Sequence, residues 1–112
     1  MQKKEALRAQ SPDHAVVATL MEEVGGGATV STVYDLYLSS RHGGDRKLVL
    51  DATYGGGISL TWLGSNTLVV RYYPGCDIHT FQNVWWSKQD IQSTSPLPPV
   101  EIILIRRPGT FQ

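Results

Sequence analysis

Short apolar segments, each closed by glycine, asparagine or proline, constrain the fold of this chain more than any other feature. In the middle of the chain they cover residues 48–54, 58–62 and 67–72, separated by a glycine run at 55–57 and a Gly-Ser-Asn at 64–66. Within each segment the residues alternate, and a period of two places successive side chains on opposite faces of a strand. The pattern predicts an antiparallel β-sheet in which each strand can bury one face.

The whole chain divides into about seven such strands and a short N-terminal helix. The helix, or a mobile arm, is expected at residues 1–10, which are rich in the helix formers Lys, Glu, Ala and Arg. Residues 14–24 fit a strand or a helix, and we favour a strand because Val and Thr suit a pleated sheet and a glycine run follows. The other strands are expected at 29–40, 47–54, 58–63, 67–73, 78–86 and 100–105.

Turn residues indicate how these strands are connected. The Gly-Ser-Asn at 64–66 predicts a tight hairpin, and Pro74-Gly75 suits the central positions of a type II turn. Residues 88–99 end in a proline-rich crossing loop, and the apolar segment 100–105 is expected to insert beside an earlier strand with both faces buried. The expected fold is one all-β, mainly antiparallel domain over 11–112, a meander forming a sandwich or a partly closed barrel.

Charge and cysteine content argue against several classes of function. The 112 residues include 10 basic and 10 acidic ones, so the excess of positive charge typical of nucleic-acid-binding proteins is missing. Cys76 is the only cysteine and cannot form an internal disulfide. No apolar stretch approaches the ~20 residues needed to span a bilayer, and no signal peptide is readable. These features leave the compartment open: we expect a periplasmic or membrane-anchored protein if an anchor lies upstream of residue 1, and a cytoplasmic one otherwise.

Two groups of proteins resemble parts of this sequence. The Ser-Pro-Asp at 11–13, the apolar run 15–20 and the aromatic-rich segment 34–37 are similar to one blade of a TolB-type β-propeller, although His14 replaces the glycine of that motif. A propeller needs several blades, and this chain holds the sequence of one. The same start, a glycine-containing first hairpin and a Trp-centred strand also resemble small bacterial single-domain proteins of unknown function. Many of these are exported or lipid-anchored, so the resemblance implies a cell-envelope location and no catalytic residues.

Aromatic side chains in the second half of the chain are the best indication of function. Adjacent aromatic pairs occur at 72–73 and 85–86, and the two members of a pair point to opposite faces of a strand. One ring can fill the core while the other is exposed for binding, unless residues 3–10 or the proline-rich loop cover that second face. Framed by loops 25–28, 41–46 and 87–99, the candidate binding residues are Trp62, Arg71, Tyr73, Trp85 and Trp86.

Patterns that would indicate catalysis or metal binding are weak. Cys76 and His79 lie three residues apart, but a zinc site needs four ligands and would also require His14 or His42. No serine lies in a Gly-x-Ser-x-Gly motif, and neither glycine run precedes a predicted helix as a phosphate loop would. We therefore predict no catalytic residue, no metal and no cofactor.

The sequence thus predicts a non-enzymatic module whose rigid sheet binds a protein partner. One alternative is an immunity protein that neutralises a cognate toxin, since such proteins are small and lack catalytic motifs. Another is a small metal-dependent or thiol hydrolase built on the cysteine and histidines named above. We also expect that open sheet edges allow copies of the chain to assemble edge to edge.

Overall fold

Nine strands and no helix make up the described part of the chain. The structure is a computed structural model that describes residues 2–24, 32–53, 57–86 and 99–107. Its strands are β1 (Gln2–Gln10), β2 (Val16–Val24), β3 (Val33–Ser40), β4 (Lys47–Thr53), β5 (Ser59–Trp62), β6 (Thr67–Tyr72), β7 (Asp77–Phe81), β8 (Val84–Trp85) and β9 (Val100–Arg106). The predicted loop at 25–28, all but the last residue of the predicted loop 87–99, and the glycines at 55–56 lie outside the described residues.

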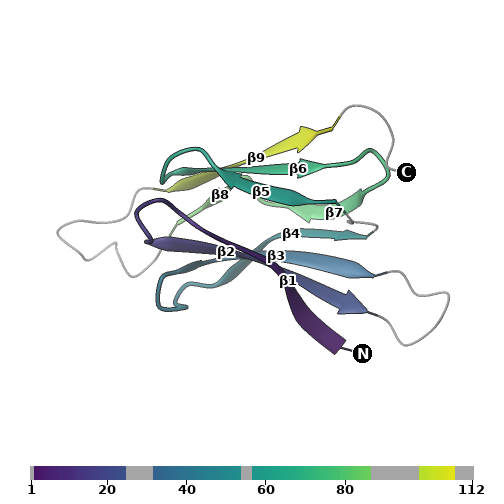
Figure 1. Cartoon of the computed structure of the whole chain (residues 1–112), viewed down its shortest axis with the longest axis horizontal. Coiled ribbons are helices and arrows are strands. Elements are labelled where there is room, and N and C mark those ends of the chain that lie inside the picture. The colour runs from purple at the N-terminus through teal and green to yellow at the C-terminus, as the bar shows by residue number, and fades with distance from the viewer. Residues whose placement is uncertain (1, 25–31, 54–56, 87–98, 108–112) are drawn as a thin grey trace.

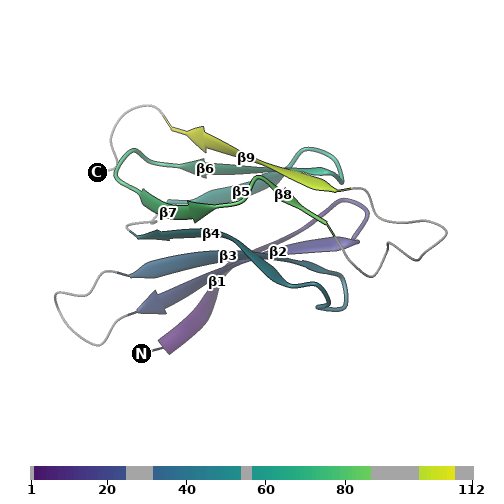
Figure 2. The ribbon, with the colours of Figure 1, turned by 180° about the vertical axis from the view of Figure 1, so that it is seen from behind.

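The strands form two sheets that lie face to face (Figure 1). Sheet A has the order β1-β2-β3-β4-β7, and all of its pairs are antiparallel. Sheet B has the order β5-β6-β9-β8, in which only β6 and β9 are parallel. Viewed from behind, the chain passes from sheet A to sheet B between β7 and β8 (Figure 2). The all-β, mainly antiparallel fold class is therefore confirmed.

The helix predicted over residues 1–10 is wrong, because this segment forms β1 at the edge of sheet A. β1 pairs with β2 along its whole length, with a bulge between Glu5 and Leu7. A helix of ten residues is barely stable by itself, whereas pairing with β2 satisfies the backbone groups of this segment that face β2. Cross-strand ion pairs add to the pairing: Lys4 Nζ lies 3.9 Å from Glu22 Oε2 and Lys3 Nζ lies 3.8 Å from Asp35 Oδ2.

The strand count also differs from the prediction, because the segment 78–86 is not one strand. It is divided into β7, which pairs with β4 in sheet A, and the short β8, which pairs with β9 in sheet B. At the division, the Gln82 N–H donates to Val49 O at 2.8 Å. The polar Gln82-Asn83 separate the two strands, but the aromatic and β-branched residues on either side suggest one continuous strand.

The last strand lies where it was expected but is buried on one face only. β9 is inserted between β6 and β8, both of which precede it in the chain. Val100 and Ile102 are 1% and 2% exposed, whereas Glu101 is exposed and Ile105 is 39% exposed. The predicted burial of both faces is therefore wrong, because sheet B carries no further layer of described strands on its outer side. The meander is limited to β1–β4 and the β5–β6 hairpin.

The two predicted turns form, one with a different backbone geometry. In the β5–β6 hairpin the Leu63 N–H donates to Thr67 O at 2.8 Å, and Gly64 has a φ of 79°, which suits glycine. After β6, the Cys76 N–H donates to Tyr73 O at 2.9 Å and closes a turn around Pro74-Gly75. Gly75 does not have a positive φ, so this is not the predicted type II turn.

The core lies between the two sheets and receives side chains from both. Leu20 and Leu36 from sheet A and Leu68 and Trp85 from sheet B are at most 2% exposed. A bulge in β4 lies opposite Leu36 and Tyr37, and because of it the adjacent Val49 and Leu50 are both buried. The two inner faces pack against each other. The outer face of each sheet is therefore the surface on which exposed candidate residues can lie.

Candidate interaction surface

The outer face of sheet B brings together residues of β5, β6 and β9. Ser59 pairs with Arg71 and Arg71 with Ile105. The residues next to them in the chain pack against the core, so these three side chains point away from it. Two positions further, directly after the ends of β6 and β9, Tyr73 and Arg107 continue the same face. We call this surface the arginine face and define it as Ser59, Thr61, Arg71, Tyr73, Ile105 and Arg107.

Hydroxyl groups and an aromatic ring hold Arg107 in place. Its Nη2 donates to Ser59 Oγ at 2.7 Å, and its Nη1 donates to Tyr73 Oη at 3.3 Å. The guanidinium carbon lies 4.9 Å from the centre of the Tyr73 ring, a cation–π distance. The Arg107 Nε is buried and has no hydrogen-bond partner within the described residues. The positive charge is therefore oriented by neutral groups.

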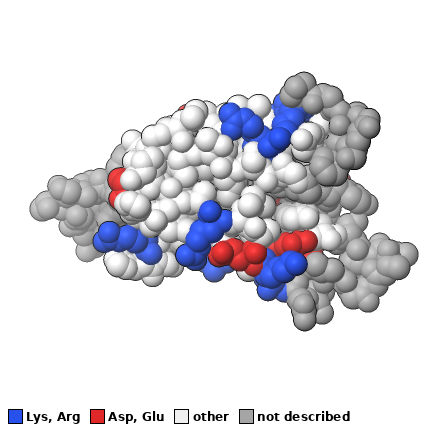
Figure 3. Space-filling model, in the orientation of Figure 1, with Lys and Arg blue, Asp and Glu red and all other residues white. Residues whose placement is uncertain are grey.

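In the part of the chain that the structure describes, the positive charge at this end of sheet B is not paired with carboxylates. Arg71 Nη1 donates to the Thr61 hydroxyl at 3.2 Å, and Arg106 at the end of β9 is exposed. Among the described residues, no ion pair joins Arg71, Arg106 or Arg107 to an acidic side chain. In Figure 3, blue side chains gather near the ends of β6 and β9 without adjoining red ones, whereas the red side chains in the lower half lie beside blue ones. The two sheets thus differ in local charge balance.

The three candidate tryptophans do not share this surface. Trp85 is completely buried, and its indole N–H donates to Asp45 O at 3.0 Å. Its neighbour Trp86 is 42% exposed, with Lys47 Nζ 5.5 Å from its ring centre. Trp62 packs against the core, and its indole N–H reaches Ala9 O in the other sheet at 3.1 Å. Of the five candidates, the structure brings together Arg71 and Tyr73.

Sequence reasoning did not select Ser59, Ile105 and Arg107. An arginine near the chain end usually lies on the solvated surface, and nothing in the local sequence distinguishes Arg107. Its position depends on the parallel pairing of β6 with β9, which joins segments that are distant in the sequence. The alternation in 100–105 would identify the outward residues of β9, but the identity of the neighbouring strand is a tertiary property.

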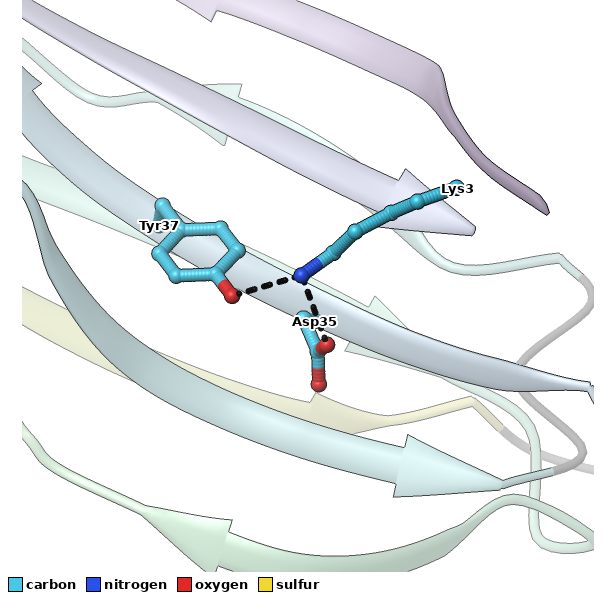
Figure 4. Close-up of polar contacts among 3 residues, drawn as sticks. All are labelled: Lys3, Asp35 and Tyr37. Carbon is cyan, nitrogen blue, oxygen red and sulfur yellow. Dashed lines mark hydrogen bonds and ion pairs between the residues drawn. The ribbon is translucent and has the colours of Figure 1, made fainter. Parts of the chain in front are cut away.

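A second polar cluster lies on the outer face of sheet A (Figure 4). Lys3 Nζ donates to Tyr37 Oη at 3.1 Å, lies 3.8 Å from Asp35 Oδ2, and lies 5.3 Å from the centre of the Tyr37 ring. Arg46 approaches the Tyr37 ring at 4.2 Å. The hydrogen bond to Tyr37 raises the pKa of Lys3. This cluster ties β1 to β3 across β2.

Asp35 has an unusual position within this cluster. It is nearly buried, and it lies directly opposite Asp51 in the β3–β4 ladder. Burial raises the pKa of Asp35, and so does the neighbouring Asp51 carboxylate, although the positive charge of Lys3 acts in the opposite direction. Burial and the like charge outweigh a single half-exposed lysine. Asp35 therefore takes up a proton more readily than an ordinary aspartate.

The residues of the predicted hydrolase alternative lie in separate surroundings. Cys76 packs against the core, and burial raises the pKa of its thiol, which disfavours the nucleophilic thiolate. His79 is exposed, and its Nε2 lies 3.1 Å from Thr53 Oγ1. His14 lies 2.9 Å from the Gln10 side chain in the β1–β2 connection, and His42 is exposed in the β3–β4 loop. Among the described residues, no group of three or more such ligands could hold a metal ion.

A shallow groove opens between the sheets beside the β1 bulge. Its volume is about 240 Å³, and it is lined by Ala6, Leu7, Leu20, Glu22, Tyr34, Gly57 and Ile58. Burial raises the pKa of Tyr34 above its ordinary value. The groove is mostly apolar, and its one carboxylate is paired with Lys4.

No protein-family model matches the chain, and neither a curated protein nor a solved structure matches it. The resemblance to a propeller blade and to small bacterial proteins, the envelope location and the immunity role thus stay predictions. Within the described residues, no helix has the length and apolar character needed to cross a membrane.

Proposed function

We propose that this protein is a non-enzymatic interaction module that binds an acidic segment of a protein partner through the arginine face. The observation that supports this most is that Arg71 and Arg107, the two arginines of this face, have no acidic partner among the described residues, and neither has the adjacent Arg106 at the end of β9. Guanidinium groups form strong paired hydrogen bonds with carboxylates, and arginine is enriched in protein interfaces.

The scaffold suits such a role. Ser59 and Tyr73 orient the Arg107 guanidinium before any partner binds, so little side-chain freedom is lost on binding. Ile105 adds exposed apolar surface beside the charges, and an interface needs such a contact in addition to ion pairs. Ser59, Arg71 and Ile105 lie in paired strands, which keep this part of the surface rigid, and Tyr73 and Arg107 directly follow β6 and β9.

A photo-crosslinking experiment can test this proposal while the partner is still unidentified. The photoreactive residue p-benzoylphenylalanine would replace Ile105 on the arginine face or, as the matched control, Leu48 on the outer face of sheet A. These two residues are equally accessible, at 39% and 37% exposed. We expect a specific adduct in the source cells from position 105 only, and mass spectrometry of the adduct should map to an acidic segment.

Substitution of Arg71 then tests the charge contribution. With the crosslinked segment as a synthetic peptide, Arg71→Ala should weaken binding by about tenfold or more, because a hydrogen bond to a charged group contributes roughly 1.5–3 kcal/mol. Arg41→Ala, which removes an exposed arginine from the β3–β4 loop, should leave the affinity unchanged. Equal adducts from positions 105 and 48, or equal affinity of the Arg71 and Arg41 variants, would refute the proposal.

A further inference from the structure

The outer edge of β1 is open. Within the described residues β1 pairs only with β2, so the N–H and C=O groups on its other side have no strand beside them. β1 lies in front in Figure 1, with its N-terminal half extending away from sheet B. An open edge of nine residues can pair with another strand, and its residues decide which strands are compatible.

The hydrogen bonds around the β1–β2 turn show which backbone groups after the bulge point to this edge. The Ser11 N–H donates to Val16 O at 2.9 Å, so Ser11 directs its backbone toward β2. Direction alternates along an antiparallel ladder, so Ala9 and Leu7 also face β2. Arg8 and Gln10 therefore direct their N–H and C=O groups to the open edge. The Trp62 indole binds Ala9 O, which is not on this edge.

The β2–β3 ladder gives the same information for the residues before the bulge. The Arg41 N–H donates to Ala15 O at 2.9 Å, so the odd-numbered residues of β2 direct their backbones toward β3. Glu5 is opposite Met21 and Lys3 is opposite Glu23. Glu5 and Lys3 must then direct their own backbone groups away from β2, to the open edge.

These four residues are symmetric about one point. Lys3 and Glu5 precede the bulge, Arg8 and Gln10 follow it, and the centre lies between Ala6 and Leu7. The bulge fixes this centre, because with any other centre some outward backbone groups of one copy would lie opposite residues of the second copy that face its own β2. We propose that β1 pairs with β1 of a second copy of this chain, antiparallel and two-fold symmetric about this point, so that the two five-stranded sheets become one.

The charges on the edge favour this register. Lys3 lies opposite Gln10 of the second copy, and Glu5 lies opposite its Arg8, on the same face of the sheet. The Glu5–Arg8 pair occurs twice by symmetry, and Arg8 Nε already reaches Glu5 Oε1 within one chain at 3.2 Å. A shift by two positions would place Lys3 opposite Arg8, where like charges repel. Charges on an edge usually prevent pairing, but here they select one partner and one register.

The apolar residues at the centre are consistent with this partner. Ala6 and Leu7 both line the groove between the sheets, and Leu7 is 39% exposed. In the proposed register Leu7 of one copy lies opposite Ala6 of the other. The two exposed leucines then lie near the symmetry axis, where each can contact Ala6 of the other copy.

Charge reversal tests the register through the oligomeric state. Glu5→Arg places a second arginine opposite Arg8 in both halves of the dimer, and Arg8→Glu places two glutamates opposite each other. Each variant alone should dissociate at least about tenfold more readily than the original chain, as measured by sedimentation over roughly a hundredfold range of concentration. A mixture of the two variants should form a heterodimer, because each copy then meets opposite charges at both pairs.

The control is Arg41→Glu, which changes an exposed charge in the β3–β4 loop, outside the open edge, and should leave the dimer intact. A chain that sediments as a monomer at all concentrations would overturn the proposal, and so would a mixture that contains no heterodimer. This inference is independent of the proposed function, because β1 and the arginine face belong to different sheets. Arg71→Ala should therefore not alter the oligomeric state.

Discussion

At the scale of single residues, the neighbour across the strand often decides what a side chain does. Asp35 looks like an ordinary outward polar residue of an alternating strand, but in the ladder it lies opposite Asp51 and within reach of Lys3. Similarly, Trp85 and Trp86 are adjacent in the chain, yet one is 0% and the other 42% exposed. Alternation predicts that such a pair is divided between core and surface, but not which member is buried.

We expect Asp35→Asn to stabilise the protein increasingly as the pH rises. The pKa of Asp35 is raised from its ordinary value of 3.8, so the contribution of this group to stability is complete below that value and is lost as the pH rises through the folded-state pKa. Each unit by which the pKa is raised corresponds to about 1.4 kcal/mol. The asparagine variant does not suffer this loss.

Urea denaturation of both proteins between acidic and neutral pH would measure the effect as a difference in unfolding free energy. Glu101→Gln, at an exposed position of β9, serves as the control and should show little difference at any pH. A difference between Asp35→Asn and the original chain that becomes smaller as the pH rises would contradict the assignment.

At the scale of elements, the β1–β2 connection shows what the Ser-Pro-Asp motif does in this chain. The Ser11 hydroxyl accepts a hydrogen bond from the Val16 N–H at 3.1 Å and donates one to Asp13 Oδ1 at 2.6 Å. The Ala15 N–H also donates to Asp13 Oδ1, at 3.1 Å. The hydrogen bond from Ser11 lowers the pKa of Asp13. The motif therefore organises a turn and has a structural explanation.

Ser11→Ala should reduce the free energy of unfolding by about 1–3 kcal/mol, because it leaves the buried Val16 N–H without an acceptor. Urea denaturation measures this, and Ser39→Ala on the outer face of β3 is the control. The pKa of Asp13 is lowered in the folded state, so its stabilising contribution is present above the ordinary value of 3.8 and is lost as the pH falls through the lowered value. Because the Ser11 hydrogen bond lowers this pKa, Ser11→Ala should lose less stability than the original chain as the pH falls. An equal loss of stability in acid for both proteins would contradict this role of Ser11.

At the scale of the whole molecule, β9 completes sheet B. It is the central partner of β6 and β8, and Val100 and Ile102 are buried against the core. Its parallel pairing with β6 joins distant parts of the chain, so the entropy of closing a long loop has to be overcome before the core is complete.

A chain that ends at residue 99 should therefore fail to fold. Without β9, Leu68 loses its neighbour in the ladder and one side of the core is opened to water. Near-ultraviolet circular dichroism of the buried Trp85 and the dispersion of amide signals in NMR would report the loss. Ile105→Ala in the full chain is the control and should cost less than about 1 kcal/mol, since this side chain is partly exposed. Native-like spectra of the truncated chain would contradict the prediction.

The sequence by itself determined the class of fold and most of its strands. Alternating residues placed β2 to β6 and β9 within a few positions, because a period of two is a local property that a half-buried strand must satisfy. It failed at residues 1–10, where helix-forming side chains are used in an edge strand. There the ladder with β2 outweighs an intrinsic preference that is worth only tenths of a kcal/mol per residue.

Only the tertiary structure decided which outward residues share a surface. Arg71 and Tyr73 could be selected from the sequence, but Arg107 and Ser59 join them through the parallel β6–β9 pairing and the β5–β6 hairpin. The direction of the backbone N–H and C=O groups on the open edge of β1 likewise depends on a bulge, and no local sequence pattern predicts that bulge. The physical reason is the same in each case: alternation specifies the face of a strand, whereas the register and the neighbouring strand are set by the packing of the whole core.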